Sequence, residues 1–238
     1  MGFFSSIGNA ISGALSTAGS LVSGLVSSLS SSIGGAISKL APSIIKPFLS
    51  LSIGEILVAV QIIVTVIGEI ADKLGVKEGE SPQEIGIMAE EAEKQGIKPE
   101  NFDSYQEYIN CIRNEIEIDK SKLGNLSIED KIKYGVVGSA ILVKGIEEKE
   151  KIEIPAEFIS EIGRQNLSIE ETRQYIKEFK SENLQLKDFT NYLRGTVEDK
   201  LYEKVGNVIE ASIRALNPDM SEQDLDRKII NMENAARK

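Results

Sequence analysis

Apolar side chains in residues 4–40 recur at a mean spacing of about 3.6 residues, which is the period of an α-helix. A strand period of two is not sustained anywhere in this stretch. The pattern therefore predicts a long N-terminal amphipathic helix whose apolar face contacts a membrane or a partner. The residues that we expect on this face are Phe3, Phe4, Ile7, Ile11, Leu15, Val22, Leu25, Leu29 and Ile33.

Another face of this segment carries small residues instead of charges. One row at a spacing of four consists of Gly8, Ser12, Ser16, Ser20, Gly24, Ser28, Ser32 and Ala36. Such rows let helix backbones approach closely, as they do between helices in membranes. A water-exposed amphipathic helix would carry charges on its outer face, so we expect this segment to pack against sister copies or other proteins. The alternative is a flexible, low-complexity Gly/Ser-rich tail.

Pro42 and Pro47 predict a break after this segment, because proline removes a backbone donor and disfavours helix in the residue before it. Residues 48–68 follow with a single charged side chain, and a helix of that length would extend about 31 Å, enough to cross a hydrocarbon core. If this helix inserts, Glu55 and Gln61 are the intramembrane or pore-lining candidates, since a carboxylate in lipid must face a bundle interior or water. The alternative is a helix buried inside a protein assembly, with Glu55 paired or facing solvent.

The rest of the chain has the pattern of amphipathic helices, without strand alternation. Four serines are each followed three residues later by an acidic residue, the pattern of a capping box at a helix N-terminus. The pairs are Ser81 with Glu84, Ser127 with Asp130, Ser168 with Glu171 and Ser221 with Asp224. Together with Pro99, Pro155 and Pro218 near helix starts, they predict helices at 69–75, 82–95, 103–117, 127–147, 155–164, 168–181, 187–216 and 221–236.

Two of these helices carry packing signals. The helix at 187–216 has apolar residues at steps of four, so its stripe should precess around the axis and contact several neighbours. The helix at 127–147 contains Gly-Val-Val-Gly-Ser-Ala at 135–140, which permits another backbone to approach closely, either in the core or at an interface.

The composition removes most catalytic chemistry. The chain has no histidine and one cysteine, so a Ser-His-Asp triad, a Cys-His pair, a His-ligated zinc site and an internal disulfide are all excluded. We predict that the protein is not an enzyme and uses no metal or cofactor. Cys111 is expected to be a small buried apolar residue. The formal charge of −10 at pH 7 disfavours direct nucleic-acid binding, which depends on Lys and Arg at phosphates.

Charge is distributed very unevenly along the chain. Residues 1–68 contain only Lys39, Lys46 and Glu55 as charged side chains, while residues 69–238 contain 25 basic and 36 acidic ones. We therefore predict an all-α fold, with long apolar N-terminal helices followed by an acidic multi-helix bundle, in an oligomeric assembly. Its expected parts are a Gly/Ser-rich amphipathic segment at 1–41, a hydrophobic helix and candidate membrane span at 42–75, and an acidic soluble helical domain at 76–238.

The N-terminus, MGFFSSIGNAISGALSTAGSLVSGLVSSLSSSIGGAISKL, resembles in kind the Gly/Ala/Ser-rich amphipathic starts of virion membrane-penetrating components. These are DNA pilot proteins of small phages, ejection proteins of tailed phages and minor capsid proteins of some animal viruses. The resemblance covers the first 40 to 70 residues and is one of composition and periodicity. It implies a structural or cargo component of a phage or phage-like particle, stored inside the particle, whose N-terminus inserts into or perforates the target cell envelope. The implied partners are sister copies in a homo-oligomer, other particle proteins and membrane lipid.

Two other functions fit the same pattern. One is a bacterial pore-forming toxin or secreted effector, found outside the cell or in a bacterial membrane. The other is a scaffolding protein whose N-terminus packs inside a protein assembly without meeting lipid. All three work by packing and not by turnover.

Overall fold

The computed structural model describes residues 24–27 and 34–237, and every structural statement below concerns these residues. Most of the predicted N-terminal face and small-residue row lies outside them. The positions within them are Leu25 on the apolar face and Gly24 and Ala36 in the small-residue row. Leu25 is buried against the core, whereas Gly24 and Ala36 are exposed. At these three positions the apolar side chain faces inward and the small residues face outward.

The described part of the chain is helical and contains no β-strand, which confirms the all-α prediction at this level. Short 3-10 turns at Lys46–Phe48, Pro99–Asn101 and Lys120–Asn125 join some of the α-helices. The α-helices are α2 (Ile37–Ile45), α3 (Ile53–Lys73), α4 (Pro82–Lys94), α5 (Tyr105–Glu115), α6 (Ile128–Glu150), α7 (Ala156–Arg164), α8 (Ile169–Ser181), α9 (Leu186–Arg194), α10 (Asp199–Leu216) and α11 (Glu222–Ala236).

Side-chain caps fix the start of each helix for which they were predicted. The hydroxyls of Ser81, Ser127, Ser168 and Ser221 accept hydrogen bonds from the backbone N–H groups three residues on, at the starts of α4, α6, α8 and α11. The capping serine is therefore confirmed at all four positions, whereas the return bond from the acidic residue to the backbone of the serine is present only at Ser81 and Ser168. Another complete box, Ser52 with Glu55, begins α3 and has the same Ser-x-x-Glu spacing. The apolar run around it predicts an unbroken helix from residue 48, so that the sequence pattern does not mark this helix start.

The predicted helix at 187–216 is wrong, because two helices occupy this stretch. α9 ends at Arg194, and Gly195 takes the left-handed conformation with φ of 69°. The N–H of Thr196 then donates to the carbonyl of Asn191 at 2.8 Å, which closes the helix end in the manner of a Schellman motif. An Arg-Gly pair is a recognisable stop signal, and the apolar steps of four on either side of it concealed it.

The predicted helix at 69–75 is also wrong as a separate element, because α3 runs without interruption from Ile53 to Lys73. Gly68 lies inside α3, where its bare backbone faces the ring of Pro82. Pro42 does not end the preceding helix either. It lies within α2, and the chain leaves the helix only after Ile45.

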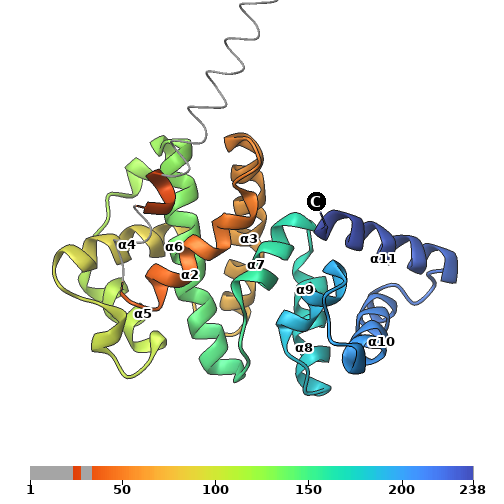
Figure 1. The fold of residues 1–238 in the computed structure, drawn as a ribbon. Coiled ribbons are helices and arrows are strands. Elements are labelled where there is room, and N and C mark those ends of the chain that lie inside the picture. Colours follow the sequence, from red (N-terminus) through yellow and green to blue (C-terminus); the bar gives the residue numbers. More distant parts are fainter. Residues whose placement is uncertain (1–23, 28–33, 238) are drawn as a thin grey trace, which may run out of the picture.

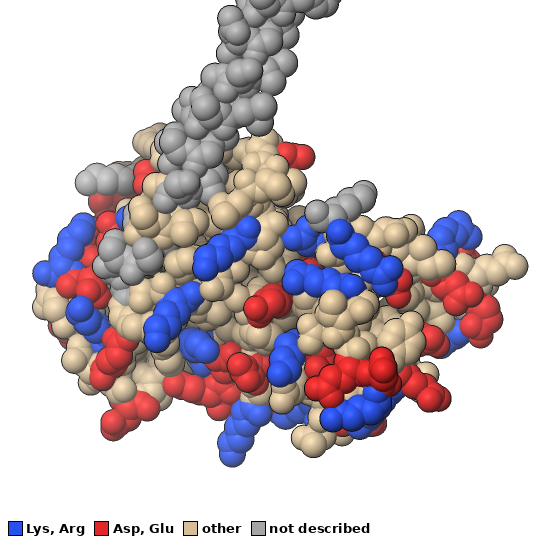
Figure 2. Space-filling model, in the orientation of Figure 1, with Lys and Arg blue, Asp and Glu red and all other residues tan. Residues whose placement is uncertain are grey.

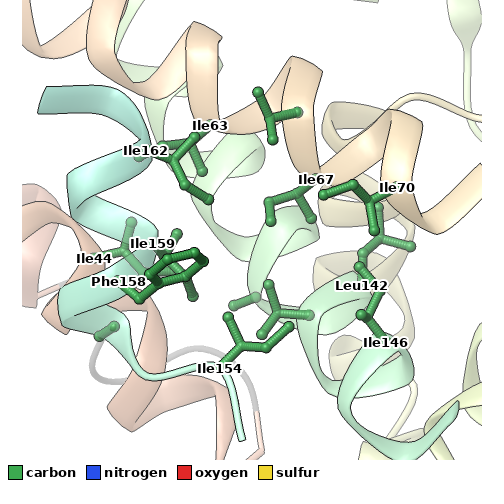
Figure 3. Packing of buried hydrophobic residues seen from close by; sticks show 14 of the residues in the cluster. Ile44, Ile63, Ile67, Ile70, Leu142, Ile146, Ile154, Phe158, Ile159 and Ile162 are labelled. Atoms are coloured by element: carbon green, nitrogen blue, oxygen red, sulfur yellow. The ribbon is translucent and has the colours of Figure 1, made fainter. Parts of the chain in front are cut away.

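α3 occupies the centre of the fold, where it packs against α6, α7 and α8 (Figure 1). Residues 42–73, which the sequence separates from the acidic body by composition, thus pack against that body in space. A close view shows the side chains that α3 contributes meeting those of α6 and α7, with Ile44 of α2 beside them (Figure 3). The labelled α3 residues are Ile63, Ile67 and Ile70, and their labelled partners are Leu142, Ile146, Phe158, Ile159 and Ile162.

α4 and α6 cross at unusually close range. A Cβ atom built on Gly138 of α6 would lie 1.7 Å from the carbonyl oxygen of Pro82, and one built on Gly86 of α4 would lie 2.2 Å from the carbonyl oxygen of Tyr134. Each helix thus presents bare backbone to the other. The Gly-rich stretch at 135–140 therefore lies in the core of this chain, which is one of the two placements that its sequence allows.

The second half of the fold has an aromatic centre. Phe189 of α9 lies with its ring centroid 4.7 Å from that of Tyr175 and 5.4 Å from that of Phe158. Phe179 of α8 approaches the same ring at 6.0 Å, edge to face. Pairs of this geometry add to the burial of the rings themselves, so α7, α8 and α9 are held together around one phenylalanine.

Candidate interaction surface

α3 is long and apolar enough to cross a membrane, by length and composition alone. In the fold, half of its most apolar 18-residue stretch is buried inside the protein. The buried residues include Ile56, Val60 and Ile63, and the outward residues include Val58. A helix that packs against the core of a soluble protein is likewise buried on one side and exposed on the other.

Glu55 and Gln61 both lie on the exposed side of α3. The Glu55 carboxylate accepts hydrogen bonds from the Ser52 hydroxyl at 2.7 Å and from the Ser52 amide at 2.9 Å. The hydroxyl and then the amide of Ser52 lower the pKa of the Glu55 carboxyl, because both bonds favour its charged form. Within this chain the carboxylate has the role of a helix cap, and it faces solvent.

Three exposed apolar side chains lie in α3 or shortly before it, and we call them the α3 apolar surface: Leu49, Leu51 and Val58. They are 47%, 36% and 61% exposed, respectively. Val58 lines two adjoining hollows of about 470 and 420 Å³. One extends towards the ends of α7 and α11, and the other towards residues 166–170 at the start of α8. Sequence reasoning did not single out these three residues, because an apolar residue in an apolar run gives no signal of exposure.

A buried charge lies next to the first hollow and connects the helices that form it. Glu161 of α7 is 0% exposed and binds Arg194 of α9 at 3.0 Å and Arg164, on its own helix, at 3.5 Å. Arg164 also donates to the carbonyl of Pro47 at 3.1 Å. Gln165 donates both to Glu161 and to the carbonyl of Met232 in α11, at 3.0 Å in each case. This polar junction holds α7, α9, α11 and the turn before α3 in one arrangement.

No group of three metal-ligating side chains is brought together among the residues that the structure describes. Cys111 is partly exposed, which corrects the expectation that it is a fully buried apolar residue. It lies on α5, whose packing face holds Tyr108, Ile109 and Ile112 instead. Blue and red side chains both occur over the face of the body shown in Figure 2, in small groups set among tan residues. Mixed charge of this kind is typical of a solvated surface.

One ion pair between distant helices makes stability depend on pH. Glu171, at the start of α8, binds Lys228 of α11 at 2.6 Å and accepts a hydrogen bond from the Ser168 amide at 2.9 Å. Burial raises the pKa of the Glu171 carboxyl, but the bonds from Lys228 and Ser168 together outweigh it, so that its pKa lies below the usual value. A carboxyl of this kind stabilises the fold above its unfolded pKa of about 4.3, and this stabilisation is lost as the pH falls through the folded pKa.

We therefore expect Glu171→Gln to lower the free energy of unfolding at neutral pH and to have progressively less effect below about pH 4.3. Urea unfolding at a series of pH values checks this, with Glu170→Gln as a control that makes the same change of net charge at an exposed neighbour. A difference between the parent and Glu171→Gln that stays constant from pH 7 to pH 3 would contradict the assignment.

No protein-family model, curated protein or solved structure matches the chain.

Proposed function

We propose that this chain is a structural protein that acts on a lipid envelope through its N-terminal segment, as a component carried by a phage or phage-like particle. One observation carries the proposal: the first 38 residues contain no charged side chain, yet they precede a helical body with a charged exterior. The apolar face from Phe3 to Ile33 is where insertion would begin. The row of small residues beside it would bring sister helices together.

The fold bears on which of the two apolar segments inserts. α3 contributes a continuous set of side chains to the core, and removing each from the core would cost about 1.5–3 kcal/mol. Its capping carboxylate, Glu55, would also have to enter lipid or be protonated. Residues 1–33 precede α2, and Leu25 is the one buried side chain among the described residues 24–27, so that their insertion displaces this side chain but does not require α3 to leave the core. We therefore assign insertion to residues 1–33 and a structural role to α3.

Dye release from vesicles of phosphatidylethanolamine and phosphatidylglycerol tests this assignment. The full chain is expected to release the dye, and the double variant Ile11→Asp, Leu15→Asp is expected to release it at least ten-fold more slowly. Each carboxylate placed at bilayer depth costs about 2.5–3.5 kcal/mol. The body should unfold at the same temperature in both proteins.

Val58→Asp is the matched control, since it places one carboxylate on the exposed side of α3. It should leave dye release unchanged. Loss of release in Val58→Asp, with Ile11→Asp, Leu15→Asp fully active, would assign insertion to α3 instead. An intact chain that leaves vesicles sealed would refute the proposal altogether.

A scaffolding role without lipid is the second candidate, and the α3 apolar surface favours it. Exposed apolar residues that border two hollows are typical of protein contact sites. If the protein is a scaffold, Val58→Asp should dissociate oligomers of the chain, which sedimentation measures. Neither the parent nor the double variant Ile11→Asp, Leu15→Asp should then release dye from vesicles.

A further inference from the structure

A separate groove runs along α8, on a part of the body that the proposed function does not use. It has a volume of about 610 Å³ and lies where the C-terminal ends of α3, α6 and α10 meet α8. Cavities of about 300–1,000 Å³ between helices are typical binding sites for small ligands. The groove is therefore large enough to hold one molecule of that class.

The floor of the groove is apolar and comes from four helices. Ile70 belongs to α3 and Leu74 is the residue that ends it, while Ile146 belongs to α6, Ile176 to α8 and Leu216 to α10. Leu216 is 38% exposed although it is a large aliphatic side chain at the edge of the groove. A ligand with a hydrocarbon chain would cover this side chain and gain about 25 cal/mol for each Å² of apolar area removed from water.

The rim of the groove is basic along α8. Arg173, Lys177 and Lys180 lie at spacings of four and three, so that they share one face of the helix. Lys180 is paired with Glu150 at 2.9 Å, and the exposed Lys177 lies 3.4 Å from the carboxylate of Glu178, its partly buried neighbour in the sequence.

Arg173 differs from the two lysines. Within the described ranges, no ion pair or hydrogen bond of the Arg173 guanidinium is found. The groove lining contains two acidic residues: Glu150, which pairs with Lys180, and Glu170 at the start of α8. In a chain with a formal charge of −10, a free guanidinium at the mouth of an apolar groove marks a place where an anion is attracted and not repelled.

We propose that this groove binds one molecule of an anionic single-chain amphiphile, a long-chain fatty acid, with its hydrocarbon tail on the apolar floor. Its carboxylate lies against Arg173 and Lys177. The guanidinium suits this role because its planar donors bind a carboxylate in a bidentate manner. Lys177 and Lys180 add positive charge beside Arg173 on the same face of α8.

The absence of tryptophan from the chain allows a direct test. Leu216→Trp places a single fluorophore at the groove, and 9,10-dibromostearate below its critical micelle concentration quenches a tryptophan that it touches. We expect saturable quenching in the full chain carrying Leu216→Trp. Tyr202→Trp is the matched reporter, since residue 202 lies about 21 Å away along the same helix, and it should be quenched little.

Charge dependence decides between the proposed site and simple apolar contact. In the Leu216→Trp chain, Arg173→Gln with Lys177→Gln should weaken dibromostearate binding at least ten-fold. The same change of charge at Lys200 and Arg227, both exposed and remote from the groove lining, should not. The methyl ester of dibromostearate should bind less tightly to the parent reporter and should not respond to the loss of the two cations.

Three results would overturn the proposal. They are equal quenching at residues 202 and 216, equal weakening by the two pairs of substitutions, and equal binding of the acid and its ester. Quenching by brominated phospholipid bilayers but not by dispersed dibromostearate would point to membrane contact and would also overturn it. If Leu216→Trp fails to fold, Ser181→Trp reports from another exposed position of the groove lining, at the end of α8. Because these experiments change residues of α8, α10 and α11 and the dye-release assay changes Ile11, Leu15 and Val58, the failure of one proposal can be distinguished from the failure of the other.

Discussion

Gly138→Ala is expected to lower the free energy of unfolding by about 3 kcal/mol. The added methyl group would lie 1.7 Å from the carbonyl oxygen of Pro82, which is backbone and cannot rotate away. α4 and α6 would have to separate, and this separation would loosen the apolar contacts on both sides of their crossing. Urea denaturation followed by circular dichroism measures the effect, and Gly86→Ala should act in the same direction because its methyl group would meet the carbonyl of Tyr134.

Gly54→Ala provides the matched control. Gly54 is also in a helix, but a Cβ atom there would meet nothing within 4 Å. Alanine has the higher helix propensity, so this variant should be as stable as the parent or up to about 1 kcal/mol more stable. A Gly138→Ala protein that unfolds within about 0.5 kcal/mol of the parent would show that the two helices do not cross at this distance.

Glu161→Ala is expected to lower the free energy of unfolding by about 3 kcal/mol, the lower end of the range for breaking a buried ion pair, because the Arg194 side chain left behind is 34% exposed and stays partly solvated. Arg194 would lose its carboxylate, and Gln165 would lose one of its two acceptors. The effect should be large because the polar junction joins three helices and the turn at Pro47. Loss of the Glu161 carboxylate would weaken the hydrogen bonds and ion pairs that hold these elements together.

A double-mutant cycle with Arg194→Ala isolates the pair. The two substitutions together should destabilise the protein by clearly less than the sum of their separate effects, because each alone leaves a charge without its partner. Glu182→Ala, which removes an exposed partner of Lys204, should have no measurable effect. Strict additivity of Glu161→Ala and Arg194→Ala would mean that the buried carboxylate does not depend on this arginine.

Local sequence signals located most helices to within a few residues, because helix starts are fixed over short distances. A serine three residues before an acidic residue caps the same turn in any surroundings, and Ser81 and Ser168 show both halves of the box. The same reasoning failed at Gly195, where a stop signal was present but the regular spacing of apolar residues was given more weight. Periodicity reports which residues share a face only when the helix is continuous.

The candidate site was less accessible to sequence reasoning than the fold. Nothing local distinguishes Val58 from Val60, yet the first is exposed and the second is buried. Likewise, Glu161 is one acidic residue among 37 acidic side chains, and only the positions of Arg194 and Gln165 show that it is a buried ion-pair partner. The Glu161–Arg194 pair joins residues that are 33 positions apart, so that no short window contains it, whereas Gln165 lies four residues from Glu161.

The sequence alone determined the helical class, the capped helix starts, the charge-free N-terminus and the exclusion of histidine chemistry, because each depends on composition or on contacts within one turn. Only the tertiary structure decided that α3 lies in the core of the body, that the side of α3 carrying Glu55 faces solvent, and that Arg173 lies at the mouth of an apolar groove. An apolar helix of 21 residues satisfies a bilayer and a protein core equally well. The helices packed around it determine which of the two it occupies.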